Sequence, residues 1–212
     1  MPAVHAAGNS LSSSEVERAM KVAAAGLALL LAAAKAGATD ASPVPAKADT
    51  CIVCHGANGI SQIAETPSLA GQPEGFLQWQ LVFFRSGTRK SPLMQAMAAT
   101  LSDDDIRRLS AYFSRLEPPP RDADGAVDAA VYEAGRQLSQ RHRCATCHKD
   151  DYSGAQATAR TANQREDYLL KALREFKAGA RTGGGVAAMA DVVYPLDDAE
   201  LRALAHFMAH LR

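Results

Sequence analysis

The most regular hydrophobic pattern in the chain is a stripe of apolar residues at intervals of three or four, and it occurs twice. The first stripe comprises Ile106, Leu109, Phe113 and Leu116, and the second comprises Leu201, Leu204, Met208 and Leu211. This spacing predicts two helices that each bury one face. Helical spacing also predicts helices over 75–84 and 167–176, whereas little of the chain alternates with period two. We therefore expect an all-α fold.

Both striped segments begin with a helix-start signal. Ser102 with Asp105 in the first, and Asp197 with Glu200 in the second, stand at the N-cap and N3 positions of a capping box. The match indicates that the two segments are copies of one element.

A second repeat supports a duplication. The stretch Phe84-Arg-Ser-Gly-Thr-Arg89 recurs as Phe176-Lys-Ala-Gly-Ala-Arg181, in the same order relative to the striped segments. The period exceeds 90 residues, far longer than the roughly 20–50 residues of a solenoid repeat. The sequence therefore predicts two tandem domains.

The domain boundaries follow from composition. We place the first domain at 39–118 and the second at 126–212, joined by a proline-rich linker at 119–125. Consecutive prolines at 118–120 lack amide donors and favour an extended conformation, so they exclude a helix or a sheet interior there.

Residues 1–38 have the features of a secretory signal peptide. Arg18 and Lys21 precede the apolar run 22–34, and small residues follow it. The run is shorter than the about 20 residues that a membrane-spanning helix needs. We expect cleavage after Ala36 or Ala38 and export to the periplasm. Because residues 1–19 are polar, Met20 is an alternative start of the signal peptide.

All four cysteines belong to two copies of the motif C-x-x-C-H, the signature of covalent haem attachment. The motifs place Cys51, Cys54 and His55 in the first domain and Cys144, Cys147 and His148 in the second. Cysteines at i and i+3 of a helical turn share one face, so two thiolates can meet neighbouring vinyl groups of a porphyrin, and the next histidine can reach the iron. The sequence predicts two covalently bound haem c groups.

Other uses of paired cysteines fit less well. Zinc ribbons separate their cysteine pairs by about 15–20 residues, whereas these pairs lie far apart in the chain. Two disulfides or a thioredoxin-like redox pair suit an exported chain. Neither requires a histidine after both pairs.

The repeat selects one methionine in each half as the second axial ligand. Met94 and Met189 each stand seven residues before the leucine that precedes a capping box. A thioether is a soft, neutral ligand, and Met/His ligation raises the reduction potential of a c-type haem. Met97 and Met208 are interpreted as fillers of the apolar core, which is a common use of methionine, and Met97 is the first alternative as a ligand.

Several polar residues are secondary candidates. Arg89 and Arg181 recur at equivalent positions, where they either neutralise a haem propionate or its surroundings or form a solvated helix end. His206 and His210 share a helix face, but their counterparts in the first half are alanine and arginine, so we expect exposed or rim histidines. His142 lies between two arginines and indicates a solvated patch.

Charge adds little to this interpretation. The chain has 23 basic and 23 acidic residues and a formal net charge of zero. This balance argues against nucleic acid or an anionic membrane as a partner. We expect membrane association only through partner proteins or an uncleaved signal.

The arrangement resembles the dihaem cytochrome c4 family over essentially the whole mature chain. The resemblance rests on the first attachment motif with Gly56, Pro67-Ser-Leu-Ala-Gly-Gln72, the stretch 84–89, Met94 and Leu101-Ser-Asp-Asp-Asp. It implies a periplasmic two-domain electron carrier in a respiratory chain that commonly feeds a terminal oxidase. A quinol-oxidising complex or a dehydrogenase is the expected donor.

The second half departs from the family pattern. Ala159 stands in place of Pro67 and Asn163 in place of Gly71. Glycines 183–185 lie in a loop before Met189 that is three residues longer than its counterpart before Met94. In the family the proline carbonyl usually receives the ring N–H of the axial histidine. We therefore expect His148 to lose that partner and the second haem to differ from the first.

The two halves also differ at their first helix. Few residues and two prolines precede the first motif, so we expect a short or missing N-terminal helix in the first half. In the second half 126–141 supplies this helix, with Gly135 available for close contact with Phe207.

Two other functions compete with that of a free carrier. One is a cytochrome subunit that accepts electrons in a periplasmic dehydrogenase. The other is a dihaem enzyme, such as a peroxidase or a thiosulfate-oxidising cytochrome, which needs an iron with an open site or an unusual ligand. Matched methionines argue against an enzyme, although the glycine loop keeps it open for the second haem.

Overall fold

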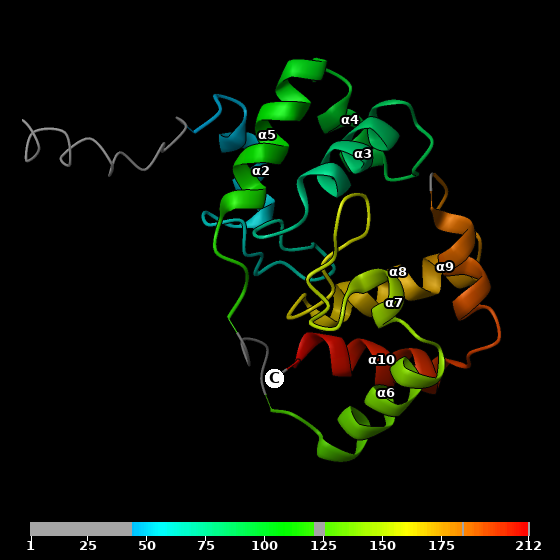
Figure 1. The fold of residues 1–212 in the computed structure, drawn as a ribbon. Helices are drawn as coiled ribbons and strands as arrows, with labels where there is room; N and C mark the ends of the chain where they lie inside the picture. Colours follow the sequence, from blue (N-terminus) through cyan, green and yellow to red (C-terminus); the bar gives the residue numbers. More distant parts are fainter. Residues whose placement is uncertain (1–43, 121–125, 184, 212) are drawn as a thin grey trace, which may run out of the picture. The chain divides into compact units, whose positions relative to one another are not determined.

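The computed structural model describes residues 44–120, 126–183 and 185–211, which form helices joined by loops (Figure 1). In the first half the helices are α2 (Ala48–His55), α3 (Glu74–Arg85), α4 (Pro92–Ala98) and α5 (Asp103–Arg115). In the second half they are α6 (Ala129–Arg141), α7 (Ala145–His148), α8 (Glu166–Lys177), α9 (Val186–Val193) and α10 (Asp198–Ala209). Within the described ranges, β structure is limited to an isolated bridge between Ala155 and Thr158. The predicted all-α class is confirmed.

The core of the first half forms where α2, α3 and α5 meet. Ala48, Leu77, Leu109 and Phe113 are buried together. Leu109 and Phe113 belong to the predicted stripe of α5, and Leu77 lies in the helix predicted over 75–84. These helices surround the attachment motif, which occupies the C-terminal part of α2.

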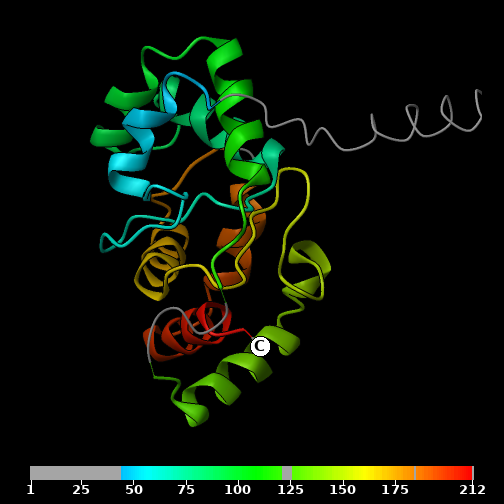
Figure 2. The ribbon, with the colours of Figure 1, turned by 90° about the vertical axis from the view of Figure 1, so that its left-hand side faces the viewer.

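The core of the second half is larger and centres on α10, which lies beside α6 in both views (Figures 1 and 2). Leu201, Leu204 and Met208 of the predicted stripe are buried. Gly135 permits the close approach of α6, since a Cβ there would lie 2.0 Å from the Ala203 carbonyl oxygen and 2.7 Å from the Phe207 Cβ. The predicted contact between Gly135 and Phe207 is confirmed.

Both predicted capping boxes are present. The Ser102 side chain accepts from the Asp105 N–H, and Asp105 accepts from the Ser102 N–H, at the start of α5. Asp197 and Glu200 form the same reciprocal pair at the start of α10. Lys47, just before α2, adds an ion pair of 2.8 Å to Asp105, so the cap of α5 also holds the start of the attachment helix.

The first half has a short first helix, as expected. Among the described residues, helix begins only at Ala48 and continues directly into the attachment motif. The corresponding α6 in the second half is a separate helix that ends before Cys144. The predicted signal peptide and the cleavage sites lie outside the described residues, as does most of the predicted linker.

Two expectations about individual side chains are wrong. Met97 is 36% exposed on α4 and does not fill the core. His206 and His210 are buried rather than exposed at the rim. Asp128, just before α6, and Glu166, in the first turn of α8, cover the end of α10. The residues at the equivalent positions of the first half gave no sign of this contact. No described helix is both long and apolar enough to cross a membrane.

Candidate functional site

The first attachment motif lies on the last turns of α2. Cys51 and Cys54 are half-buried, and His55 ends the helix as a buried residue. Gly56 then turns the chain with φ of +86°, and a Cβ at this position would lie 2.0 Å from the Ile60 carbonyl oxygen. Only glycine fits such a turn without strain, so the helix stops where the histidine must point inward.

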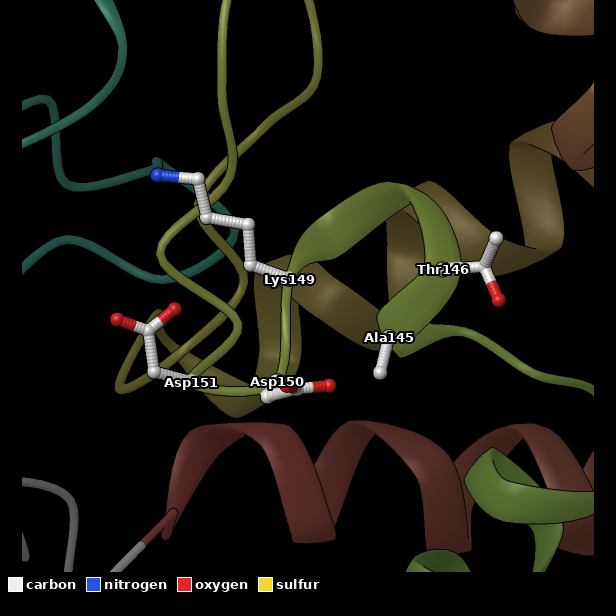
Figure 3. A pocket seen from close by; sticks show the side chains of 5 residues that line it. All are labelled: Ala145, Thr146, Lys149, Asp150 and Asp151. Atoms are coloured by element: carbon white, nitrogen blue, oxygen red, sulfur yellow. The ribbon is translucent and has the colours of Figure 1, made fainter.

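The second motif lies on the short helix α7. Cys144 precedes the helix and is half-buried, whereas Cys147 is exposed. Lys149 takes the position of Gly56 and also has a positive φ, of 68°. An open surface depression lies against this motif, with Lys149 and Thr146 projecting to opposite sides (Figure 3). Its lining residues flank the cysteines and His148, so the depression belongs to the attachment region.

None of the four cysteines forms a disulfide in the described structure. Burial raises the pKa of both the Cys51 and the Cys144 thiol. Two unpaired thiols three residues apart, each pair followed by a buried imidazole, form the donor set that covalent haem attachment requires. The thiols remain available for thioether bonds because no disulfide competes for them.

The two histidines are oriented in the same way. His55 Nδ1 lies 2.7 Å from the Pro67 carbonyl oxygen, and His148 Nδ1 lies 2.8 Å from the Ala159 carbonyl oxygen. A carbonyl only accepts, so each Nδ1 carries the proton and each Nε2 keeps its lone pair for a metal. Burial lowers the pKa of both imidazoles, and the carbonyl bond opposes this in part.

The expectation that His148 lacks a carbonyl partner is therefore wrong. The acceptor is a main-chain oxygen, which alanine supplies as well as proline does when the loop keeps its path. Asn163 keeps that path, because it adopts φ of +56° where Gly71 adopts +67°. Asparagine tolerates this left-handed region better than most residues.

The predicted axial methionines lie on matching short helices. Met94 is half-buried on α4, where its N–H is held by the N-cap side chain of Ser91. Met189 is half-buried on α9 and packs against the core of the second half. The residue before α9 is Gly185, with φ of +75°, so the second methionine helix starts from the glycine loop and has no side-chain cap.

Arg89 and Arg181 come together between the two halves. Arg89 donates to Gln80 Oε1 at 2.6 Å and to the Tyr168 hydroxyl at 3.2 Å, and Arg181 donates to the same Gln80 oxygen at 3.3 Å. Each guanidinium also lies over the phenylalanine of its own repeat, with Cζ 4.5 Å from the ring centre of Phe84 for Arg89 and 4.6 Å from that of Phe176 for Arg181. Both arginines are buried, so the solvated alternative is excluded.

Arg89 and Arg181, with Gln80 and Tyr168, form an arginine cluster that has no carboxylate to balance its positive charge among the described residues. In the described part of the chain neither Arg89 nor Arg181 forms an ion pair with a carboxylate. Burial lowers the pKa of Arg181. Burial also opposes ionisation of Tyr168, but the two guanidiniums outweigh it and lower the pKa of this phenol to about 8. Buried cations of this kind require an anionic partner.

Glu166, His206 and His210 form a further polar cluster, which is better explained by hydrogen bonding than by a metal. One Glu166 oxygen lies 3.0 Å from His206 Nδ1 and 3.2 Å from His210 Nε2. His206 Nε2 accepts the N–H of Asp128 at 3.0 Å, so the Nδ1 proton faces Glu166. If a metal bound His206 Nδ1, the imidazole proton would move to Nε2. Two donors, this Nε2 proton and the N–H of Asp128, would then face each other, which is unfavourable.

Sequence reasoning assigned no role to four side chains that lie between the halves. Gln80 and Tyr168 contact the two arginines, and Gln72 and Gln164 form bonds between the histidine loops. The sequence did contain one signal, because Gln164 stands at the position of Gln72 in a stretch where the proline and the glycine both change.

Comparison with known proteins agrees with the architecture. The family model described as "Cytochrome c" matches residues 132–212, and the model described as "Cytochrome C oxidase, cbb3-type, subunit III" matches residues 39–113. The two matched ranges follow one another in the chain, as two tandem cytochrome c domains do.

Relatives cover most of the chain. It is 34% identical over 166 residues to cytochrome c4 of Azotobacter vinelandii, a match that covers 70% of this chain and 77% of the relative. It is 32% identical to a "Thiosulfate dehydrogenase electron acceptor" of Thiomonas intermedia, over 78% of this chain and 80% of the relative. The crystal structure of reduced cytochrome c4 from Pseudomonas stutzeri matches with a TM-score of 0.73 and 29% identity, over 82% of this chain and all of that one. The chain therefore belongs to the cytochrome c4 family, as a dihaem electron-transfer protein with two covalently bound haem c groups.

Proposed function

We propose that His55 with Met94, and His148 with Met189, are the axial ligand pairs of two low-spin haems that pass electrons between periplasmic proteins. The observation that carries this proposal is the repeated histidine geometry, in which a main-chain carbonyl fixes the Nδ1 proton and leaves Nε2 free. Haem c supplies one-electron chemistry to the protein, and Met/His ligation favours a high reduction potential.

The chain's own residues hold the donor atoms in place. Cys51 and Cys54 lie in one helix and would tether one edge of a porphyrin, while the Pro67 carbonyl holds the Nδ1 proton of His55 and leaves Nε2 free. Met94 and Met189 lie on short helices after the repeated arginine motif. With both axial positions filled, no open coordination site remains for a substrate, and the protein acts as a carrier rather than an enzyme.

Arg89 and Arg181 act as partners of haem propionates in this proposal. Both are buried, and within the described ranges neither has a carboxylate partner. Replacing either arginine with glutamine should therefore change the midpoint potential of at least one haem. Unchanged potentials in both variants would contradict this role.

The cellular setting follows from the segment before the first domain. The signal-like sequence at 1–38 supports cleavage and a mature chain in the periplasm, with the haem domains at 39–118 and 126–212. In this setting a quinol-oxidising complex or a dehydrogenase supplies electrons and a terminal oxidase receives them. N-terminal sequencing of the exported protein tests the cleavage site.

A second candidate function is that of an acceptor for one dehydrogenase. Relatives of similar length from Thiomonas intermedia and Stutzerimonas stutzeri are described as thiosulfate dehydrogenase electron acceptors. Copurification from native periplasm discriminates the two, because a dedicated acceptor should elute with its dehydrogenase and a free shuttle should not.

Mass spectrometry and optical spectroscopy test the central proposal. The mature protein should carry the mass of two haems, and the oxidised protein should show the near-infrared band of methionine bound to ferric haem. Met94→Ala and Met189→Ala should each remove part of that band. A mass gain of one haem, or a band that survives both substitutions, would overturn the ligand assignment.

A further inference from the structure

Two buried glutamine side chains occupy equivalent positions between the halves. Gln72 and Gln164 each follow the loop that carries the carbonyl acceptor of a haem-motif histidine, and each is 4% exposed. Neither contacts a cysteine, a histidine or a methionine of the proposed ligand set through any hydrogen bond in the described chain.

Each glutamine pairs with the main chain of the opposite half. Gln164 Oε1 accepts the N–H of Ser68 at 2.8 Å, and its Nε2 donates to the Ser68 carbonyl at 2.8 Å. Gln72 Oε1 accepts the N–H of Arg160 at 3.0 Å, and its Nε2 donates to the Arg160 carbonyl at 2.9 Å. The two pairings are equivalent under the duplication, because Arg160 stands at the position of Ser68.

The paired residues lie next to the carbonyls that orient the histidines. The N–H of Ser68 and the carbonyl of Pro67 belong to one peptide group, and that carbonyl accepts the Nδ1 proton of His55. The N–H of Arg160 and the carbonyl of Ala159 form the corresponding group for His148. One peptide group therefore links each histidine to a glutamine of the other half.

We infer that Gln72 and Gln164 are positioning residues that tune the axial histidine of the opposite half. A bond accepted from a peptide N–H polarises that peptide and makes its carbonyl a better acceptor, since hydrogen bonds in a chain strengthen one another. A stronger carbonyl bond makes the histidine more electron-donating and stabilises the ferric state, because groups outside the ligand shell tune the metal. Gln164 thus lowers the potential of the first haem, and Gln72 lowers that of the second.

This inference also explains which residues the second loop retains. Proline and glycine of the first loop are replaced by Ala159 and Asn163, yet the glutamine is kept as Gln164. The carbonyl that accepts from the histidine and the N–H that donates to the glutamine are main-chain groups, so they are present whatever side chains the loop carries. The glutamine amide is a side-chain group, and its donor and acceptor are both used.

The test is a crossed effect on the two potentials of the intact dihaem protein. Gln72→Met should raise the midpoint potential of the second haem, and Gln164→Met should raise that of the first. Each potential is assigned to a half from the paramagnetic NMR signals of the bound methionines, identified with Met94→Ala and Met189→Ala. Gln72→Asn and Gln164→Asn, which shorten the side chain but keep the amide, provide a milder pair if the methionine variants fold poorly.

Half-buried Gln78 and exposed Gln137 serve as matched controls. Gln78 and Gln137 bond to glutamates of their own helices, and their replacement by methionine should leave both potentials unchanged. A potential shift in the half that carries the substitution, equal shifts in both halves, or no shift would each overturn the inference. It rests on the proposed His/Met ligation, and the two failures are distinguishable: a wild-type spectrum without two His/Met haems refutes the ligation, whereas an intact spectrum without the crossed shift refutes only the inference.

Discussion

Gly135→Ala probes how closely α6 and α10 pack in the second half. A Cβ at this position would lie 2.0 Å from the Ala203 carbonyl oxygen, a separation that real Cβ atoms do not show. The helices must move apart by about 1 Å to bring this contact to 3.0 Å. A gap of that size forfeits about a quarter to a half of the dispersion energy of the contacts across it.

The expected loss of stability combines two opposing effects. Overpacking of a close contact costs about 1–3 kcal/mol, and the upper end applies because the obstructing atom is main chain and cannot rotate away. Alanine is a better helix former than glycine by about 1 kcal/mol, which offsets part of this. We expect a net destabilisation of about 2 kcal/mol, and a melting temperature lower by about 4–8 °C for a domain pair of this size.

Thermal unfolding of the holoprotein, followed by far-ultraviolet circular dichroism, measures this effect. Ala134→Gly is the matched control, because residue 134 is exposed on the same helix and reports helix propensity alone. It should cost about 1 kcal/mol. A combined Gly135→Ala and Phe207→Ala variant should not recover stability, since the nearest obstruction is the Ala203 oxygen. An unchanged or raised melting temperature for Gly135→Ala would refute the close packing of the two helices.

Two further predictions concern the cap of α5 and the glycine loop before α9. Hydrogen bonds from Lys47 and Ser102 hold the pKa of Asp105 well below its usual range, so its stabilising contribution is present above about pH 4 and is lost as the pH falls through the lowered pKa. Lys47→Met should therefore reduce the decline in urea stability between pH 5 and pH 3, and an unchanged decline would contradict this. Thr182 donates to the Thr88 carbonyl of the first half at the start of the glycine loop, so Thr182→Val should increase carbon monoxide binding to ferrous protein at the second haem only. Equal binding at both haems, or none, would count against that anchoring role of the loop.

The sequence alone determined the elements and the chemistry of attachment. Helix starts were readable because Ser102 and Asp197 cap their helices through residues three positions later, a local interaction. The cysteine motifs were readable for the same reason, since covalent attachment needs its donors within one helical turn. The duplication then predicted one methionine ligand per half from the repeat alone.

The loops were harder to predict because main-chain groups act there. The substitution of Ala159 for Pro67 suggested that His148 loses its acceptor, yet the carbonyl oxygen is present in both residues. What decided the outcome was the path of the loop, which Asn163 preserves in a left-handed conformation. Comparing the residue types at aligned positions does not show in which direction a main-chain carbonyl points.

Only the tertiary structure decided which polar groups meet across the chain. His206 and His210 are buried because Glu166 and Asp128, from other elements, supply their hydrogen-bond partners. The pairing of Gln72 with Arg160 likewise joins residues on separate loops. Local periodicity specifies which face of an element is apolar, whereas the partner of a buried polar group depends on distant segments brought together by packing. For this reason the sequence determined the two haem motifs, and the tertiary structure determined how each half contacts the histidine loop of the other.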